Sequence, residues 1–167
     1  MSDMLQARVI QGQDIYDITG ETIVTDEVVI VKQILSPLAP GDCLIIGKDA
    51  KDVSPEHALE YVAAYTAGND ISSRKLQRDP AYAGVVPQWG FSKGFDTFAP
   101  LGPVLVAASE IPDPSQLHLK TIVDGEVRQD ETVGDLLFDC KYLISYLSQG
   151  TTLQKGSVIM TGTPGGE

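Results

Sequence analysis

The stretch Gly68-Asn69-Asp70-Ile71-Ser72-Ser73-Arg74-Lys75-Leu76-Gln77 gathers a carboxylate, amides and cations directly behind a glycine. A second segment, residues 92–103, carries Lys93 and Thr97 among glycines and prolines, and a third, residues 161–164, reads Thr-Gly-Thr-Pro. Charged and amide side chains are rarely fully buried, so packing does not explain them well. Together the three segments predict one binding site for an oxygen-rich anion and a hard metal ion.

Composition places the chain among ordinary globular proteins. Its 167 residues are enough for one domain with a sizeable core, and 43% of them are hydrophobic. The net charge of −11 disfavours binding to nucleic-acid phosphates or anionic membranes. No apolar run reaches the 18 residues of a membrane span, and the N-terminus lacks a targeting pattern. We therefore expect a cytoplasmic protein, with the mitochondrion as the alternative, in which Cys43 and Cys140 are reduced and buried.

Hydrophobic patterning predicts a β-rich α+β chain. The dipeptide Asp124-Gly125 is typical of a two-residue hairpin turn. Ser54-Pro55-Glu56 predicts the start of a short helix, and the apolar spacing over residues 134–148 predicts a longer one. Residues 62–71 either continue the first helix or form a strand. Strands are expected over residues 7–10, 14–18, 28–34, 43–46, 103–107, 117–123, 126–129 and 157–161.

Five motifs occur in one order along the chain: residues 68–74, 92–103, 110–114, 123–129 and 161–164. In order and approximate spacing they resemble the C-terminal catalytic domain of the fumarylacetoacetate hydrolase family. Members with a similar pattern include acylpyruvate hydrolases, oxaloacetate decarboxylases or tautomerases, and hydroxymuconate isomerases. The resemblance implies an α+β fold built on a mixed β-roll, here incomplete. It further implies a small N-terminal β segment over residues 1–41 and a truncated catalytic domain over residues 42–167.

The resemblance also implies a function. Family members are metal-dependent hydrolases, isomerases or decarboxylases that act on small 2-oxo or enol acids, commonly as homodimers. A Mg²⁺ or Mn²⁺ ion stabilises the negative charge that develops on the keto oxygen. Matched residue by residue, Asp70, Lys93 and Thr97 lie around the metal, and Lys93 is the active-site lysine. Gln77 and Thr163 match substrate-binding positions.

The residues alone leave simpler interpretations open. Asn69 and Asp70 could form an Asx turn, Lys93 and Gln77 could lie on a solvated face, and Thr-Gly-Thr-Pro is by itself only a turn signal. Arg74 could bind a carboxylate, but a structural ion pair is the simpler expectation. His57 is expected to be exposed, and His118 to lie in an amphipathic strand.

Two parts of the family pattern are missing. Members carry a Glu-x-Glu pair whose positions fall here on Ala39 and Gly41, and Asp42 is one residue out of register. Members also carry a lid with a His-Glu pair, whereas here residues 36–43 join the flanking segments directly. A single aspartate would hold a divalent ion poorly. The alternative prediction is therefore a catalytically inactive remnant or dimerisation partner.

Overall fold

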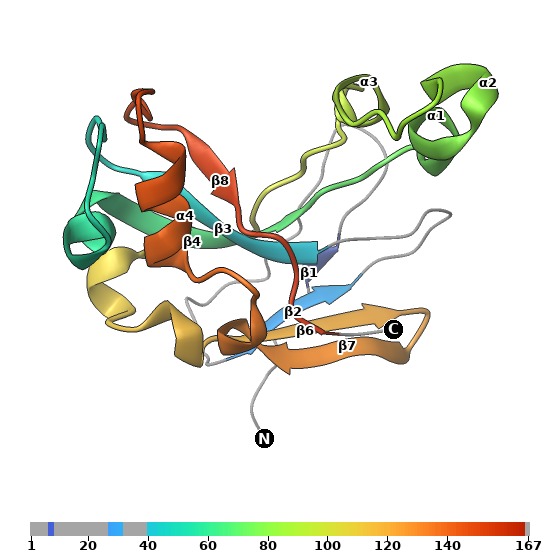
Figure 1. Ribbon diagram of the computed structural model, residues 1–167. Coiled ribbons are helices and arrows are strands. Elements are labelled where there is room, and N and C mark those ends of the chain that lie inside the picture. The colour runs from blue at the N-terminus through green and yellow to red at the C-terminus, as the bar shows by residue number, and fades with distance from the viewer. Residues whose placement is uncertain (1–6, 9–26, 32–39, 166–167) are drawn as a thin grey trace.

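The computed structural model describes residues 7–8, 27–31 and 40–165, and within them the chain forms two four-stranded sheets. Figure 1 shows the two sheets one above the other, with a short helical arm projecting from one end of the molecule. The β-rich α+β class predicted from the sequence is confirmed. The expected division at residue 41 stays a prediction, and the expected strand at residues 14–18 lies outside the described residues.

Sheet A combines parallel and antiparallel pairs in the order β1-β2-β6-β7. Strand β2 pairs in parallel with both β1 and β6, and β6 and β7 form an antiparallel hairpin. Its turn has φ of 52° at Asp124 and 84° at Gly125, so the predicted hairpin is confirmed. The strands are β1 (Ala7–Arg8), β2 (Glu27–Val31), β6 (His118–Val123) and β7 (Glu126–Thr132).

Sheet B is antiparallel throughout and has the order β5-β4-β3-β8. Its central strands pair from Pro40 with Asn69 to Ile46 with Val62, so the end of β4 lies beside the start of β3. The chain over residues 62–69 therefore takes the strand alternative. The strands are β3 (Pro40–Ile46), β4 (Val62–Asn69), β5 (Val106–Ala107) and β8 (Val158–Met160).

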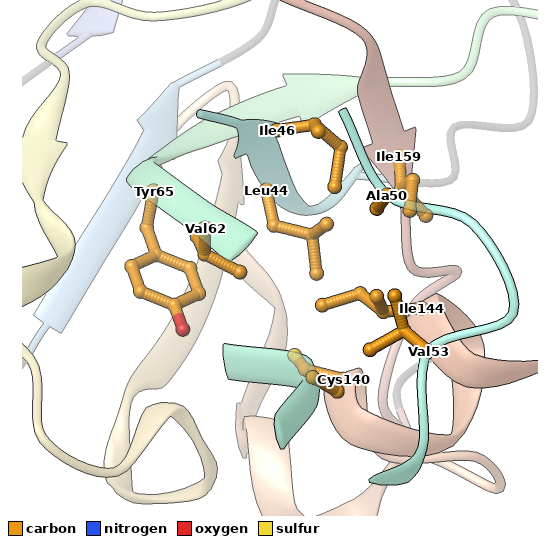
Figure 2. Packing of buried hydrophobic residues seen from close by; sticks show 10 residues of the cluster. Leu44, Ile46, Ala50, Val53, Val62, Tyr65, Cys140, Ile144 and Ile159 are labelled. Carbon is orange, nitrogen blue, oxygen red and sulfur yellow. The ribbon is translucent and has the colours of Figure 1, made fainter. Parts of the chain in front are cut away.

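The main core lies where sheet B meets helix α4 (Cys140–Leu147) and the 3₁₀ helix η1 (Pro55–Tyr61). Figure 2 shows Leu44 and Ile46 of β3 directed toward Ile144 of α4. Cys43 and Cys140 are both buried, as predicted. The other buried members are Ala50, Val53, Ala58, Val62, Tyr65, Cys140 and Ile159.

A helical arm leaves sheet B after β4, and Figure 1 shows it apart from both sheets. It consists of α1 (Arg74–Arg78), α2 (Pro80–Ala83) and α3 (Gly90–Lys93). A backbone hydrogen bond of 2.9 Å from Ser73 N to Ser92 O ties the start of α1 to α3. Three short 3₁₀ helices complete the described elements: η2 (Ala108–Glu110), η3 (Pro114–Gln116) and η4 (Val133–Asp135).

Three predicted element boundaries are corrected. The helix expected from residue 134 begins at Cys140, because the Asp139 carboxylate caps it by accepting from Tyr142 N at 2.7 Å. The strand expected over residues 103–107 is limited to β5. The strand expected over residues 43–46 begins earlier, at Pro40. The helix predicted at Ser54 does begin there, as 3₁₀. Among the described residues, no helix has the length and apolar character that a membrane span requires.

Candidate functional site

Asp70 and Lys93 meet in space although 23 residues separate them in the sequence. Asp70 follows the last residue of β4, and Lys93 ends α3, which the Ser73–Ser92 backbone bond holds against the start of α1. The Lys93 ammonium donates to Asp70 Oδ2. About one third of each side chain is exposed, 30% for Lys93 and 34% for Asp70. Ligands can therefore reach a carboxylate–ammonium pair at the base of the arm.

Backbone hydrogen bonds fix the Asp70 loop. Ile71 N donates both to Asn69 O and to Phe98 O, each at 3.0 Å. Ser72 Oγ donates to Asp70 O at 3.3 Å. In the part of the chain that the structure describes, the Asp70 carboxylate accepts from Lys93 and from no backbone N–H. Asn69 Oδ1 accepts no hydrogen bond either, so the Asx-turn interpretation of Asn69-Asp70 is wrong, and the Asp70 carboxylate instead contacts Lys93.

Gln77 is fully buried on α1, at 0% exposure, so the solvated-face interpretation is wrong. Arg74 Nη1 donates to Gln77 Oε1 at 2.7 Å. A guanidinium has no acceptor, so this contact fixes the orientation of the Gln77 amide. Gln77 Nε2 then remains a buried donor without a partner. Among the described ion pairs none includes Arg74, so its expected structural ion pair is replaced by a bond to Gln77.

Asn69 is a candidate residue that the sequence reasoning did not select. It ends β4, is 2% exposed, and both its Nδ2 and Oδ1 lack hydrogen-bond partners. Buried polar groups in native proteins are nearly always paired, so orphaned groups suggest a missing ligand or water. Its position directly before Asp70 was the only available signal.

Thr97 lies on the loop after α3, exposed, at a φ of 68°. This left-handed conformation is uncommon for a β-branched residue, and such strain often accompanies functional sites. Within the described residues no hydrogen bond joins Thr97 to Asp70 or Lys93. Trp89 does flank the pair, as its ring centre lies 5.2 Å from Lys93 Nζ. Phe91 is largely exposed nearby on α3.

Thr163 lies in the segment that continues β8 and contacts sheet A. Its hydroxyl accepts from Gln129 Nε2 at 2.6 Å. This segment also passes beside β3, because a Cβ placed on Gly41 would overlap the carbonyl oxygen of Gly162. Gly41 in turn pairs with Gly68 of β4. Within the described residues no hydrogen bond joins Thr163 to Asp70, Lys93 or Gln77.

Gln129 is the second residue that sequence reasoning missed. It is 7% exposed on β7 and joins Thr121 on β6 to the Thr163 segment. It belongs to the hairpin motif of residues 123–129, but the motif gives no sign of a partner 34 residues away.

The histidines lie outside this arrangement. His57 is exposed on η1, as predicted, where Glu60 accepts a hydrogen bond from its ring and raises its pKa. His118 lies in β6, as predicted, 3.1 Å from Asp130 Oδ1.

Comparison with known proteins decides the family. Residues 43–167 match the model of the fumarylacetoacetate (FAA) hydrolase C-terminal domain. The chain belongs to the fumarylacetoacetate hydrolase family. A fumarylacetoacetate hydrolase domain-containing protein 2 homolog from Dictyostelium discoideum is 42% identical over 131 residues, which are 74% of this chain and 42% of that protein. This chain of the fumarylacetoacetate hydrolase family thus spans less than half the length of that curated relative.

Solved structures of the family agree with the fold. The fumarylpyruvate hydrolase of Pseudomonas aeruginosa, in complex with Mn²⁺ and pyruvate, has a TM-score of 0.68 at 31% identity, covering 84% of this chain and 64% of that one. The 5-carboxymethyl-2-hydroxymuconate delta-isomerase of Mycobacterium smegmatis has a TM-score of 0.67 at 38% identity, covering 84% and 54%. The chain is thus related to hydrolases and isomerases of this family.

The described residues do not fit the divalent ion seen in that fumarylpyruvate hydrolase. No group of three or more His, Cys, Asp or Glu that could hold a metal occurs in the described part of the chain. Asp70 is a single carboxylate already engaged by Lys93. Gly41 offers no side chain, Ala39 lies outside the described residues, and Mg²⁺ or Mn²⁺ usually requires more oxygen ligands.

Proposed function

We propose that this chain carries the anion-binding part of a fumarylacetoacetate hydrolase family site, for a small 2-oxo or enol acid. The observation that carries the proposal is the Lys93 ammonium held on Asp70 at a partly exposed position. Two further side-chain donors support the proposal: the unpartnered Gln77 Nε2 and the Thr163 hydroxyl. A site with several donors and one carboxylate suits an oxygen-rich anion. The pyruvate in the fumarylpyruvate hydrolase complex belongs to this chemical class.

Lys93 supplies the chemistry that such a site supports. When a 2-oxo acid tautomerises or loses CO₂ from the carbon beside its keto group, an electron pair moves onto the keto oxygen. A fixed ammonium stabilises that negative charge more strongly than water does, because it needs no reorientation. Gln77 and Thr163 would orient the acid by hydrogen bonds to its oxygens. Hydrolysis would additionally need a general base to activate water.

A second candidate function is a non-catalytic one. Gly41 stands where the family pattern has a carboxylate, and the Gly162 carbonyl oxygen occupies the space that a side chain at this position would need. This observation favours an inactive remnant or an association partner that keeps the fold and the anion donors but not the metal. The metal dependence, the homodimer and the cytoplasmic location all stay predictions for this chain.

Oxalate binding measured by calorimetry, with and without Mn²⁺, tests the proposal on the full chain. Lys93→Met should weaken oxalate binding at least tenfold, because it removes the main positive charge. Lys75→Met is the matched control, since Lys75 is an exposed lysine on the same arm. Asp70→Asn separates the two modes of binding. If the site works without metal, this variant binds oxalate more tightly, because a repelling carboxylate is removed and Lys93 is freed.

If binding instead requires Mn²⁺ and Asp70→Asn abolishes it, ligands from beyond the described residues complete a metal site. Failure of the folded protein to bind oxalate under either condition would leave the non-catalytic candidate.

A further inference from the structure

Gln129 makes three side-chain hydrogen bonds. Its Nε2 donates to Thr163 Oγ1 at 2.6 Å and to the Pro164 carbonyl oxygen at 2.7 Å. Its Oε1 accepts from Thr121 Oγ1 at 3.0 Å. Both Gln129 and Thr121 are buried, at 7% and 3% exposure. One side chain of sheet A thus holds the segment that carries a proposed ligand-binding hydroxyl.

The chemistry of the partners fixes the direction of each bond. The Pro164 carbonyl oxygen can only accept, so the amide atom that faces it must be the NH₂ group of Gln129. A flipped amide would place two acceptors against each other. Gln129 Oε1 can only accept, so the Thr121 hydroxyl must donate to it. The amide orientation therefore follows from its neighbours.

Because of this orientation, the Thr163 hydroxyl oxygen acts as an acceptor toward Gln129. Thr163 Oγ1 accepts one of the two amide hydrogens, so its own hydrogen is left for another partner. Thr163 is exposed, and within the described residues its hydroxyl donates to no protein group. A hydroxyl held in this way presents a donor outward. The hydroxyl hydrogen can therefore donate to an anionic oxygen, while the second lone pair of Thr163 Oγ1 stays open.

We propose that Gln129 is a positioning residue that, supported by Thr121, orients the Thr163 hydroxyl to donate to a carboxylate of the ligand. The inference rests on the proposed function, since it assumes that Thr163 contacts the bound acid. Gln129 itself does not contact the ligand. It acts by fixing where the Thr163 segment lies and which way the hydroxyl hydrogen points.

A double-mutant cycle tests this role, with oxalate affinity as the readout under the condition in which the unaltered chain binds. Gln129→Met keeps most of the side-chain volume and adds no charge. It should weaken oxalate binding about tenfold, the scale of a charge-assisted hydrogen bond. Thr163→Val should weaken binding by a similar factor. The double variant should bind no more weakly than Thr163→Val alone, because Gln129 then has no hydroxyl to orient.

Two further variants sharpen the cycle. Gln154→Met is the matched control, because Gln154 is an exposed glutamine that takes no part in the hydrogen bonds to the Thr163 segment; this variant should bind as the unaltered chain does. Thr163→Ser keeps the hydroxyl, so it should retain most of the affinity as long as Gln129 is present.

The outcomes separate the inference from the function on which it rests. If the unaltered chain binds oxalate and Gln129→Met binds equally well, the positioning role is wrong and the proposed function stands. If the effects of Gln129→Met and Thr163→Val multiply, Gln129 acts structurally and not through the hydroxyl. No oxalate binding by the folded unaltered chain overturns both proposals. Should Gln129→Met not fold, Thr121→Val replaces it. The role is supported if Thr121→Val weakens oxalate binding in the unaltered chain but has no further effect in a chain that carries Thr163→Val. An unchanged oxalate affinity of Thr121→Val overturns the role.

Discussion

At the scale of single residues, the orientation of two buried amides is set by partners that can only donate or only accept a hydrogen bond. The Arg74 guanidinium can only donate, so it takes the oxygen of Gln77 and leaves the amide nitrogen free. The Pro164 carbonyl can only accept, so it takes the nitrogen of Gln129. At Gln77 the donor left over is its own Nε2, whereas at Gln129 both amide hydrogens are used and the hydrogen left over is that of the Thr163 hydroxyl. The Asp70 carboxylate, in contrast, is an acceptor, and the Lys93 ammonium donates to it. This pattern supports recognition of an anion before any metal is considered.

Gly41 gives the first prediction at this scale. Gly41→Ala places a Cβ against the carbonyl oxygen of Gly162, and backbone on both sides must shift. We expect unfolding free energy to fall by about 1–3 kcal/mol, the usual cost of overpacking. Urea unfolding followed by circular dichroism measures it. Gly90→Ala is the control, because the nearest atom to its Cβ is the end of a Gln88 side chain at 3.8 Å.

If the urea midpoint of Gly41→Ala is unchanged, the Thr161–Pro164 segment moves aside at no cost. The space beside residue 41 would then not be closed to a side chain. The same barrier would face a glutamate introduced at this position. The sequence could identify Gly41 as a missing ligand. It could not show that the space for a ligand is also gone, because that depends on a segment 121 residues further along the chain.

At the scale of elements, helix α4 shows how a cap overrides an apolar pattern. The spacing of Leu136 with later apolar residues predicts a helix from residue 134. Yet the Asp139 carboxylate accepts from Tyr142 N and begins the helix at Cys140. An aspartate side chain that satisfies a free N–H at a helix start competes with continuing the helix through it. Strands were easier to predict, because alternation and the Asp124-Gly125 turn are local signals.

Capping of α4 gives the second prediction. Asp139→Ala should lower the unfolding free energy by about 1 kcal/mol, because Tyr142 N loses its acceptor. Asp139→Asn keeps an acceptor oxygen and should cost only a few tenths of that. The urea midpoints of Asp139→Ala and Asp139→Asn measure the two losses of stability. Equal losses for both would show that the charge of Asp139 near the helix N-terminus matters more than its hydrogen bond.

At the scale of the whole molecule, the described side chains join the two sheets through few contacts. The main cluster draws its buried residues from sheet B, α4, η1 and the loop between β3 and η1. On the side of sheet A, Leu119 of β6 packs with Ala67 of β4 in a separate small cluster. The Gln129 bonds to Thr163 and Pro164 add a polar link. The candidate site therefore depends on how firmly sheet A stays in place, since Thr163 is held from that sheet.

Leu119 gives the last prediction. It is fully buried, so Leu119→Ala should lower the unfolding free energy by about 2–5 kcal/mol. Because its described partners lie between the sheets, we expect hydrogen exchange to accelerate mainly in β6 and β7, while β3 and β4 stay protected. Ile144→Ala is the matched comparison: it removes an equally buried side chain from the main cluster and should expose β3, β4 and α4 instead. If both variants accelerate exchange over both sheets alike, the sheets open as one unit, and Thr163 cannot be released without losing Asp70 and Lys93 as well.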